Sequence, residues 1–158
     1  MKKAIFAAGC FWHVQFEFDK LKGVNKTTSG YTGGDEKKYP NPTYEIVCTG
    51  KTGYAEAVEV VYDDKIVIYE KLLDIFWKNH NPASLNKQGA DVGTQYRAVS
   101  FYLDDNQKKL AEKSKKEIEK MSAPRKIYTS IEKAKTFYKA EEYHQKYLEK
   151  HGAGYCRF

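Results

Sequence analysis

The chain has 158 residues, of which 41% are hydrophobic and 30% charged, and its formal net charge is +6. A chain of this length forms one domain that buries roughly 70% of its unfolded surface, so its stability does not depend on disulfide bonds. Its three cysteines include no Cys-x-x-Cys pair and its four histidines have no metal-ligand spacing, which argues against a secreted disulfide framework and a structural metal site. We expect a single domain without a metal or cofactor.

The basic excess and the N-terminal apolar run both have simple interpretations. The lysines are scattered between Lys65 and Lys150, a pattern of solvated faces rather than a nucleic-acid-binding stripe. The start from Lys2 to Cys10 superficially resembles a lipoprotein export signal, but its apolar core of five residues is shorter than the roughly 7 to 15 that such signals use. No segment approaches the ~18 apolar residues of a membrane span. We expect a cytoplasmic protein that binds neither nucleic acid nor membrane.

The first half of the chain alternates between strand and helix patterns. Apolar periodicity and turn residues predict a strand over Lys3–Ala8, a helix over Phe11–Leu21, a strand over Lys26–Tyr31, a loop over Asp35–Thr43 and a strand over Ala55–Tyr62. Within the first predicted helix, one apolar stripe consists of Phe11, Val14, Phe18 and Leu21.

The second half predicts more helix. We expect a helix over Ile68–Asn79, a long loop over Asn81–Gln95, a strand over Arg97–Leu103 with Leu103 inward, a helix capped by Asp105 and ending near Met121, a strand over Lys126–Ser130 and a helix over Lys139–Lys150. Since strands and helices do not alternate strictly, we predict an α+β fold, a two-layer sandwich with a mixed central β-sheet covered by helices. A loose C-terminal tail follows over residues 151–158.

Cys10 is the first candidate for chemistry. It follows Gly9 at the point where a predicted strand gives way to a helix, and Phe11 and Trp12 come directly after it. The free N–H groups at a helix start favour the thiolate, which is the reactive form of cysteine. The alternative is a buried, inert thiol. The aromatic neighbours favour a substrate with a small apolar group beside the atom attacked.

Glu56 is a candidate proton donor. It shares one face of its predicted strand with Val58 and Val60, so we expect its side chain to point inward. A carboxyl group in an apolar pocket has a raised pKa and can donate a proton near neutral pH. The alternative is a residue at the strand edge that faces water.

Four further residues have both a chemical and a purely structural interpretation. Tyr44 and Tyr96 lie in predicted loops, where phenols can be aimed at a ligand, although either could be a packing residue. Asp91, two residues before Gly93, is most simply a turn former. Cys156 lies near the chain end, where a mobile thiol could approach a reactive one, or could be an irrelevant surface cysteine.

Six motifs, in chain order, closely resemble those of the A-type peptide methionine sulfoxide reductases. They are Gly9-Cys10-Phe11-Trp12, Gly30-Tyr31-Thr32-Gly33-Gly34, Asn41-Pro42-Thr43-Tyr44, the run from Val47 to Val58, Gly93-Thr94-Gln95-Tyr96-Arg97 and Tyr143-His144-Gln145-x-Tyr147-Leu148. The resemblance runs from the first predicted strand to the tail. It implies an α+β sandwich with a mixed sheet, in agreement with the fold predicted from the order of strands and helices.

The resemblance also implies a role for each matching residue. It implies that Cys10 attacks the sulfoxide sulfur, that Phe11 and Trp12 hold the methyl group of methionine, that Glu56, Tyr44 and Tyr96 surround the sulfoxide oxygen, and that Asp91 binds the substrate's main chain. The implied substrate is the S epimer of methionine sulfoxide, free or in proteins.

The implied cycle passes through a cysteine sulfenic acid. Cys156 on the mobile tail of a single catalytic domain, residues 1–158, would resolve the Cys10 sulfenic acid into a disulfide, with Cys48 as a fallback resolver. A thioredoxin-like dithiol would reduce that disulfide. The chain departs from the common family pattern at His13, Gln15 and Tyr54, and its loop over Asp35–Pro40 is slightly longer.

Two other classes remain open on the residues alone. A thiol peroxidase would use the same cysteine pair to reduce peroxide, without preference between sulfoxide epimers. A basic, tyrosine-rich binding module would keep its activity without Cys10, and its affinity would fall steeply with salt.

Overall fold

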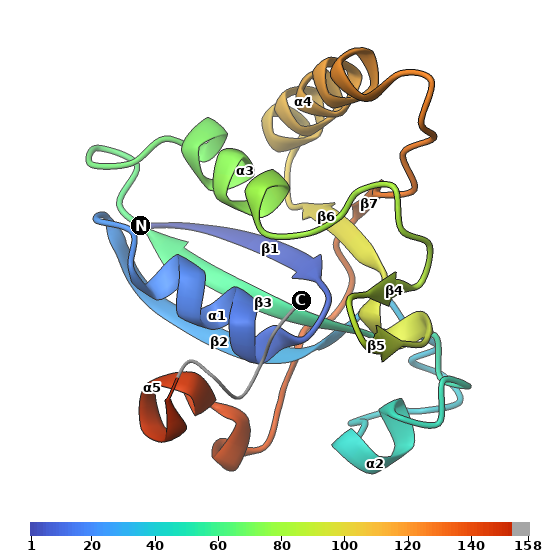
Figure 1. Cartoon of the computed structure of the whole chain (residues 1–158). Helices are drawn as coiled ribbons and strands as arrows, with labels where there is room; N and C mark the ends of the chain where they lie inside the picture. The colour runs from blue at the N-terminus through green and yellow to red at the C-terminus, as the bar shows by residue number, and fades with distance from the viewer. Residues whose placement is uncertain (153–158) are drawn as a thin grey trace.

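The computed structural model describes residues 1–152 of the chain (Figure 1). Of the predicted tail, it describes His151, the last residue of a short helix, and Gly152. Cys156 and its predicted role as resolver lie outside the described residues.

The described residues form one six-stranded mixed sheet and one small hairpin. The sheet order is β7-β6-β1-β3-β2-β8, antiparallel throughout except for the parallel pair β6 and β7. The sheet strands are β1 (Lys2–Ala8), β2 (Val24–Thr32), β3 (Ala55–Tyr62), β6 (Ala98–Tyr102), β7 (Ser130–Lys133) and β8 (Tyr138–Lys139). The hairpin pairs β4 (Lys87–Gln88) with β5 (Asp91–Val92).

Helices cover one face of the sheet. The helices are α1 (Phe11–Asp19), α2 (Tyr44–Val47), α3 (Tyr69–Lys78), α4 (Asp105–Ser122) and α5 (Tyr147–His151), with 3-10 turns at Thr94–Tyr96 and Glu142–His144. Figure 1 shows α1 over β2 and β3, and α3 beside β1. Phe6 of β1 stacks on Phe18 of α1 and Phe76 of α3, at ring-centroid distances of 5.2 and 5.1 Å. These stacked rings join both helices to the central strand of the sheet.

The opposite face has a smaller apolar cluster. It includes Ile5, Ala57 and Phe101, and Phe137 from the connection between β7 and β8 packs against it. A single helical layer on a mixed sheet is the α+β two-layer arrangement that the sequence predicts, and the prediction is confirmed.

The prediction of a helix over Lys139–Lys150 is wrong. Only its last residues, in α5, form an α-helix, and residues 142–144 form a 3-10 turn. The side chain of Gln145 exchanges hydrogen bonds with the backbone N–H and C=O of Ser29, at 2.9 Å each, which ties this segment to the edge of β2. Lys146 then adopts a left-handed backbone conformation with φ 53°, which an α-helix does not permit.

Smaller corrections concern element boundaries and loops. The strand expected over Lys126–Ser130 lies at β7, and the α4 cap is Asp104, whose side chain accepts the Gln107 N–H at 2.8 Å, rather than Asp105. Leu103 is 46% exposed because β6 ends before it. The first predicted loop, Asp35–Thr43, ends where α2 begins. The second, Asn81–Gln95, contains the β4–β5 hairpin and the start of the turn at Thr94–Tyr96.

His80, at the end of α3, makes stability depend on pH. The ring is 8% exposed, its Nδ1 donates to the Phe76 carbonyl at 2.6 Å, and its Nε2 therefore accepts from the Thr129 hydroxyl at 2.8 Å. Burial lowers the pKa of His80 from 6.5 to about 4. As the pH falls, His80 is therefore protonated in the unfolded chain before it is protonated in the folded protein. The stability that is present above pH 6.5 is lost as the pH falls towards 4.

We therefore expect His80→Gln to flatten the pH dependence of unfolding. Between pH 7 and pH 4 the wild-type protein should lose up to about 3 kcal/mol more free energy of unfolding than the variant. Urea denaturation of both proteins at several pH values measures the difference, and the other histidines cancel in the comparison. Equal losses in the two proteins would show that His80 does not control this dependence.

Candidate active site

The strand register brings three predicted site residues to one end of the sheet. β1 ends at Ala8, which pairs with Ala98 at the start of β6, so Cys10 and Tyr96 lie just beyond two adjacent strand ends. Phe6 pairs with Val58, which places Glu56 level with the end of β1. The sheet therefore brings the predicted thiol, acid and phenol together from distant parts of the sequence.

Cys10 is the N-cap residue of α1, and Glu56 lies directly beneath it. The Phe11 N–H, first in the helix, donates to Glu56 Oε1 at 3.2 Å. Glu56 is 2% exposed, so the predicted inward orientation is confirmed. Cys10 itself is half-buried. A buried carboxyl group thus sits one hydrogen bond away from the backbone that carries the thiol.

Two aromatic side chains follow the thiol. Phe11 is buried, with its ring centroid 5.7 Å from that of Tyr31. Trp12 is half-buried and donates its indole N–H to His144 Nδ1 at 3.0 Å. Tyr147 stacks on the indole, with ring centroids 3.7 Å apart. The apolar wall predicted from the sequence therefore has contributions from the C-terminal segment.

Tyr44 begins α2 and faces the same site. Its ring centroid is 4.5 Å from that of His144, and its backbone N–H donates to Glu141 Oε2 at 2.9 Å. The other oxygen of Glu141 accepts the Tyr31 hydroxyl at 2.8 Å. Burial, followed by interactions with Cys48 and the negative charge of Glu56, raises the pKa of Tyr44. The phenol therefore remains a hydrogen-bond donor at any physiological pH.

Tyr96 and Asp91 come from the segment that contains the β4–β5 hairpin and the 3-10 turn after it. Burial, followed by the negative charges of Glu56 and Asp91, raises the pKa of Tyr96, so this phenol is also a permanent donor. Asp91 begins β5 and pairs with Gln88, so it is a strand residue rather than the turn former considered above. Burial raises the pKa of Asp91 as well.

The residues that depart from the family pattern have structural partners. Gln15 is buried, and its Oε1 accepts the Ser29 hydroxyl at 2.9 Å and the Lys146 N–H at 2.7 Å. Burial lowers the pKa of His13, partly offset by Glu17.

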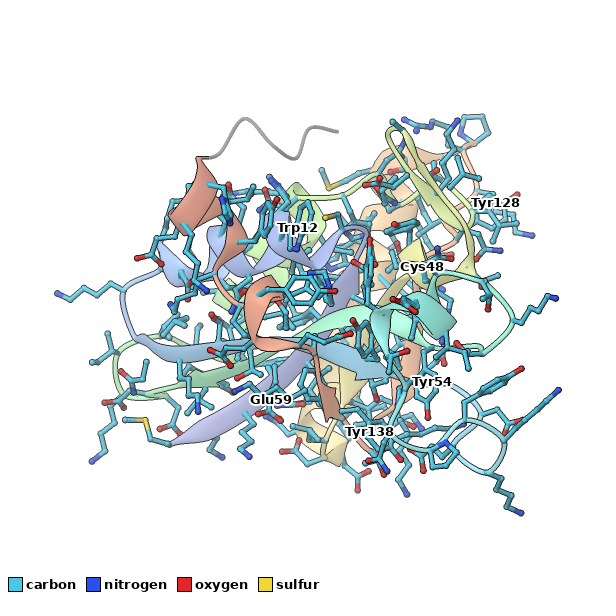
Figure 2. All side chains as sticks on the ribbon, turned by 90° about the horizontal axis from the view of Figure 1, so that it is seen from below. Trp12, Cys48, Tyr54, Glu59, Tyr128 and Tyr138 are labelled. Carbon is cyan, nitrogen blue, oxygen red and sulfur yellow. The ribbon has the colours of Figure 1, made fainter. Side chains whose placement is uncertain are left out.

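Tyr54 holds the longer loop in place. Its hydroxyl donates to the Tyr39 carbonyl at 2.8 Å, and its ring meets Tyr138 edge-on at 5.8 Å. Figure 2 shows Tyr54 and Tyr138 on neighbouring segments. A Cβ at Gly34 would approach the Tyr54 ring to 2.5 Å, so only glycine fits there.

Cys48 differs from Cys10 in its surroundings. It is exposed, lies at the C-terminal end of α2, and desolvation raises its thiol pKa. A thiol at a helix C-terminus lacks the stabilisation that N–H groups give at a helix start. These features support its assignment as a fallback rather than as the nucleophile.

The part of the chain that the structure covers, residues 1–152, contains no group of three or more His, Cys, Asp or Glu side chains placed to bind a metal ion. Within the same residues, no helix is both long and apolar enough to cross a membrane.

The model of the family described as peptide methionine sulfoxide reductase matches residues 2–158. The chain belongs to this family. The peptide methionine sulfoxide reductase MsrA of Methanothermobacter thermautotrophicus is 53% identical over 156 residues, 98% of this chain and 90% of that protein. The resemblance inferred from the six motifs is therefore confirmed.

Solved structures of the family show the same fold. Mxr1 from Saccharomyces cerevisiae in reduced form matches with a TM-score of 0.92 at 38% identity, covering 98% of this chain and 88% of that chain. Mxr1 in complex with Trx2 matches with a TM-score of 0.64 at 26% identity, covering 92% and 84%. As a member of the peptide methionine sulfoxide reductases, the chain thus has the family's α+β fold.

Several residues of this site have no role in the prediction from sequence. The motif from Tyr143 to Leu148 was a visible signal for His144 and Tyr147, but its periodicity suggested an ordinary helix. Glu141 and Tyr31 gave no chemical signal, since their pairing joins residues far apart in sequence.

Proposed function

We propose that this chain reduces the S epimer of methionine sulfoxide, free or in proteins, in the cytoplasm, with Cys10 as nucleophile and Glu56 as proton donor. The observation that carries the proposal is the hydrogen bond from the Phe11 N–H to the buried carboxyl group of Glu56, which fixes an acid beside the N-cap thiol. Membership of the reductase family supports the same reaction.

The first step transfers the sulfoxide oxygen to the enzyme. The Cys10 sulfur attacks the substrate sulfur while Glu56 protonates the sulfoxide oxygen, since an unprotonated oxygen is a poor leaving group. This attack gives an adduct with an S–S bond between Cys10 and the substrate. The oxygen then moves to the Cys10 sulfur: the S–O bond to the substrate sulfur and the S–S bond break, an S–O bond to Cys10 forms, and methionine leaves reduced while Cys10 is oxidised to a sulfenic acid. Burial favours the neutral form of Glu56, whereas the Phe11 N–H favours its anion, so the acid can give up its proton as charge develops.

The two phenols complete the oxygen site. Tyr44 and Tyr96 stay protonated and can donate hydrogen bonds to the sulfoxide oxygen. Phe11 and Trp12 would contact the methyl group, and Asp91 would bind the substrate's main chain.

The second stage restores the thiol. Cys156 attacks the sulfenic sulfur of Cys10, the S–O bond breaks, water leaves and a Cys10–Cys156 disulfide forms. A thioredoxin-like dithiol then reduces this disulfide by exchange and is itself oxidised. The solved complex of Mxr1 with Trx2 supports a reductant of this kind.

An assay on separated epimers tests the reaction itself. We expect methionine to form from the S sulfoxide with a dithiol reductant, and the R sulfoxide to react at least about 10²-fold more slowly, because the wrong epimer exchanges its methyl group and oxygen between an apolar wall and polar donors. Equal rates for the two epimers, or faster reduction of hydrogen peroxide, would favour the thiol peroxidase instead.

Cys156→Ser isolates the resolving step. Without reductant, we expect the variant to release about one methionine per enzyme and to stop at the sulfenic acid, because the sulfur that forms the disulfide is missing. Acid-quenched methionine measurement and mass spectrometry of the protein check both points. A disulfide between Cys10 and Cys48 in the variant would show that Cys48 serves as the resolver.

A further inference from the structure

Trp12 is fixed on two sides by one short C-terminal segment. His144 Nδ1 accepts the indole N–H at 3.0 Å, and the Tyr147 ring lies parallel to the indole within 6°, at a centroid distance of 3.7 Å. We name His144 and Tyr147 the indole clamp. A hydrogen bond fixes the rotation of the indole in its plane, and a stacked ring fixes that plane, so together they leave a single orientation.

The protonation state of His144 is set by its hydrogen bond to the indole. Because the indole nitrogen can only donate, Nδ1 of His144 carries no proton, and the neutral ring holds its proton on Nε2. The ring is 1% exposed, and within residues 1–152 its Nε2 has no hydrogen-bond partner. A buried polar atom without a partner costs stability, so this histidine is poorly explained by packing alone.

The clamp is itself held in place by buried amides. Gln145 bonds to the backbone of Ser29, and the Lys146 N–H donates to Gln15 Oε1 at 2.7 Å. Gln15 lies on α1, the same helix that carries Trp12. The segment between the two clamp residues is therefore hydrogen-bonded both to the sheet and to α1, the helix that Cys10 caps.

We propose that His144 and Tyr147 are positioning residues that hold the Trp12 indole at a set distance from Cys10 and thereby restrict the alkyl group on the sulfoxide sulfur to methyl. This inference rests on the proposed function. Trp12 lies two residues after Cys10 in the first turn of α1, so a shift of the ring changes the space beside the attacked sulfur. One added methylene in a well-defined apolar pocket reduces kcat/KM by about 10- to 200-fold.

The test compares the S epimers of methionine sulfoxide and ethionine sulfoxide. The readout is kcat/KM for methionine sulfoxide divided by kcat/KM for ethionine sulfoxide. An equal loss of activity on both substrates does not change this ratio. His144→Leu removes the acceptor, whereas His144→Asn is smaller but keeps an acceptor oxygen near the position of Nδ1. Tyr147→Leu removes the stacked ring, and Tyr147→Phe retains it.

We expect the ratio to fall about tenfold in His144→Leu and Tyr147→Leu and to stay within about twofold of wild type in His144→Asn and Tyr147→Phe. Trp12 fluorescence, measured with Trp77→Phe as background, should lose anisotropy in the two leucine variants only. Tyr147 is half-exposed, so its leucine variant tests the clamp even where a change at the buried His144 prevents folding.

An unchanged ratio and anisotropy in folded Tyr147→Leu would overturn the clamp. That result leaves the proposed function intact, because it concerns only the choice between methyl and ethyl. A wild-type protein that reduces neither substrate would instead reject the proposed function.

Discussion

Cys10→Ser is expected to lower the reduction of methionine S-sulfoxide by at least about 10³-fold, because a hydroxyl at this position is neither ionised by the helix start nor nucleophilic towards sulfur. Serine has nearly the same volume as cysteine and can also cap a helix, so α1 and its contact with Glu56 should remain. Methionine release in a single turnover, measured with enzyme in excess over substrate, gives the effect on the chemical step directly.

Cys48→Ser is the matched control for this substitution. It makes the same chemical change at an exposed thiol whose environment disfavours the thiolate, and its single-turnover rate should stay within a few-fold of wild type. If Cys48→Ser lost as much activity as Cys10→Ser, or if Cys10→Ser turned over normally, the assignment of the nucleophile would be wrong.

The thiol and the acid were predictable because their signals are local. A strand followed by Gly9 and Cys10 places the thiol at a helix start whatever the remainder of the chain does, and the alternation around Glu56 decides which way its side chain points. The two central strands could be predicted for the same reason, since β1 ends in a continuous apolar run over residues 4–8 and β3 alternates in burial over its second half.

The C-terminal part of the site was not predictable because long-range hydrogen bonds override its local pattern. Apolar spacing between Lys139 and Lys150 suggests a continuous helix, yet Gln145 gives its side-chain bonds to Ser29 of β2, and Lys146 adopts a left-handed conformation. His144 and Tyr147 reach Trp12 only as a result of this break. The two partners of each contact are more than 100 residues apart in the sequence, so a local pattern cannot reveal them.

The short elements at the edge of the site were also not predictable from the local sequence pattern. α2 has four residues, and each strand of the β4–β5 hairpin has two, lengths at which the helical and strand periods cannot be told apart. Tyr44 and Asp91 were therefore recognised by residue type and motif, and their positions came from the tertiary structure.

Glu56→Gln is expected to slow the chemical step by about 10² to 10⁴-fold, the usual contribution of a general acid. Glutamine keeps an oxygen that can accept the Phe11 N–H and fills the same buried space, so the fold and the helix start are preserved while the transferable proton is lost. Single-turnover methionine formation from the S sulfoxide measures the loss, and unchanged thermal unfolding verifies that the substitution is local.

The pH profile separates loss of the acid from loss of binding. A general acid donates only in its protonated form, so the wild-type single-turnover rate should fall at high pH, and Glu56→Gln should remove that fall while leaving substrate affinity within a few-fold. Glu56→Asp keeps a carboxyl group but withdraws it by one methylene from the Phe11 N–H, so it should retain the pH dependence at a reduced rate. Since Tyr44 and Tyr96 remain protonated over the same range, a pH dependence that survived in Glu56→Gln would transfer the role of proton donor to another group.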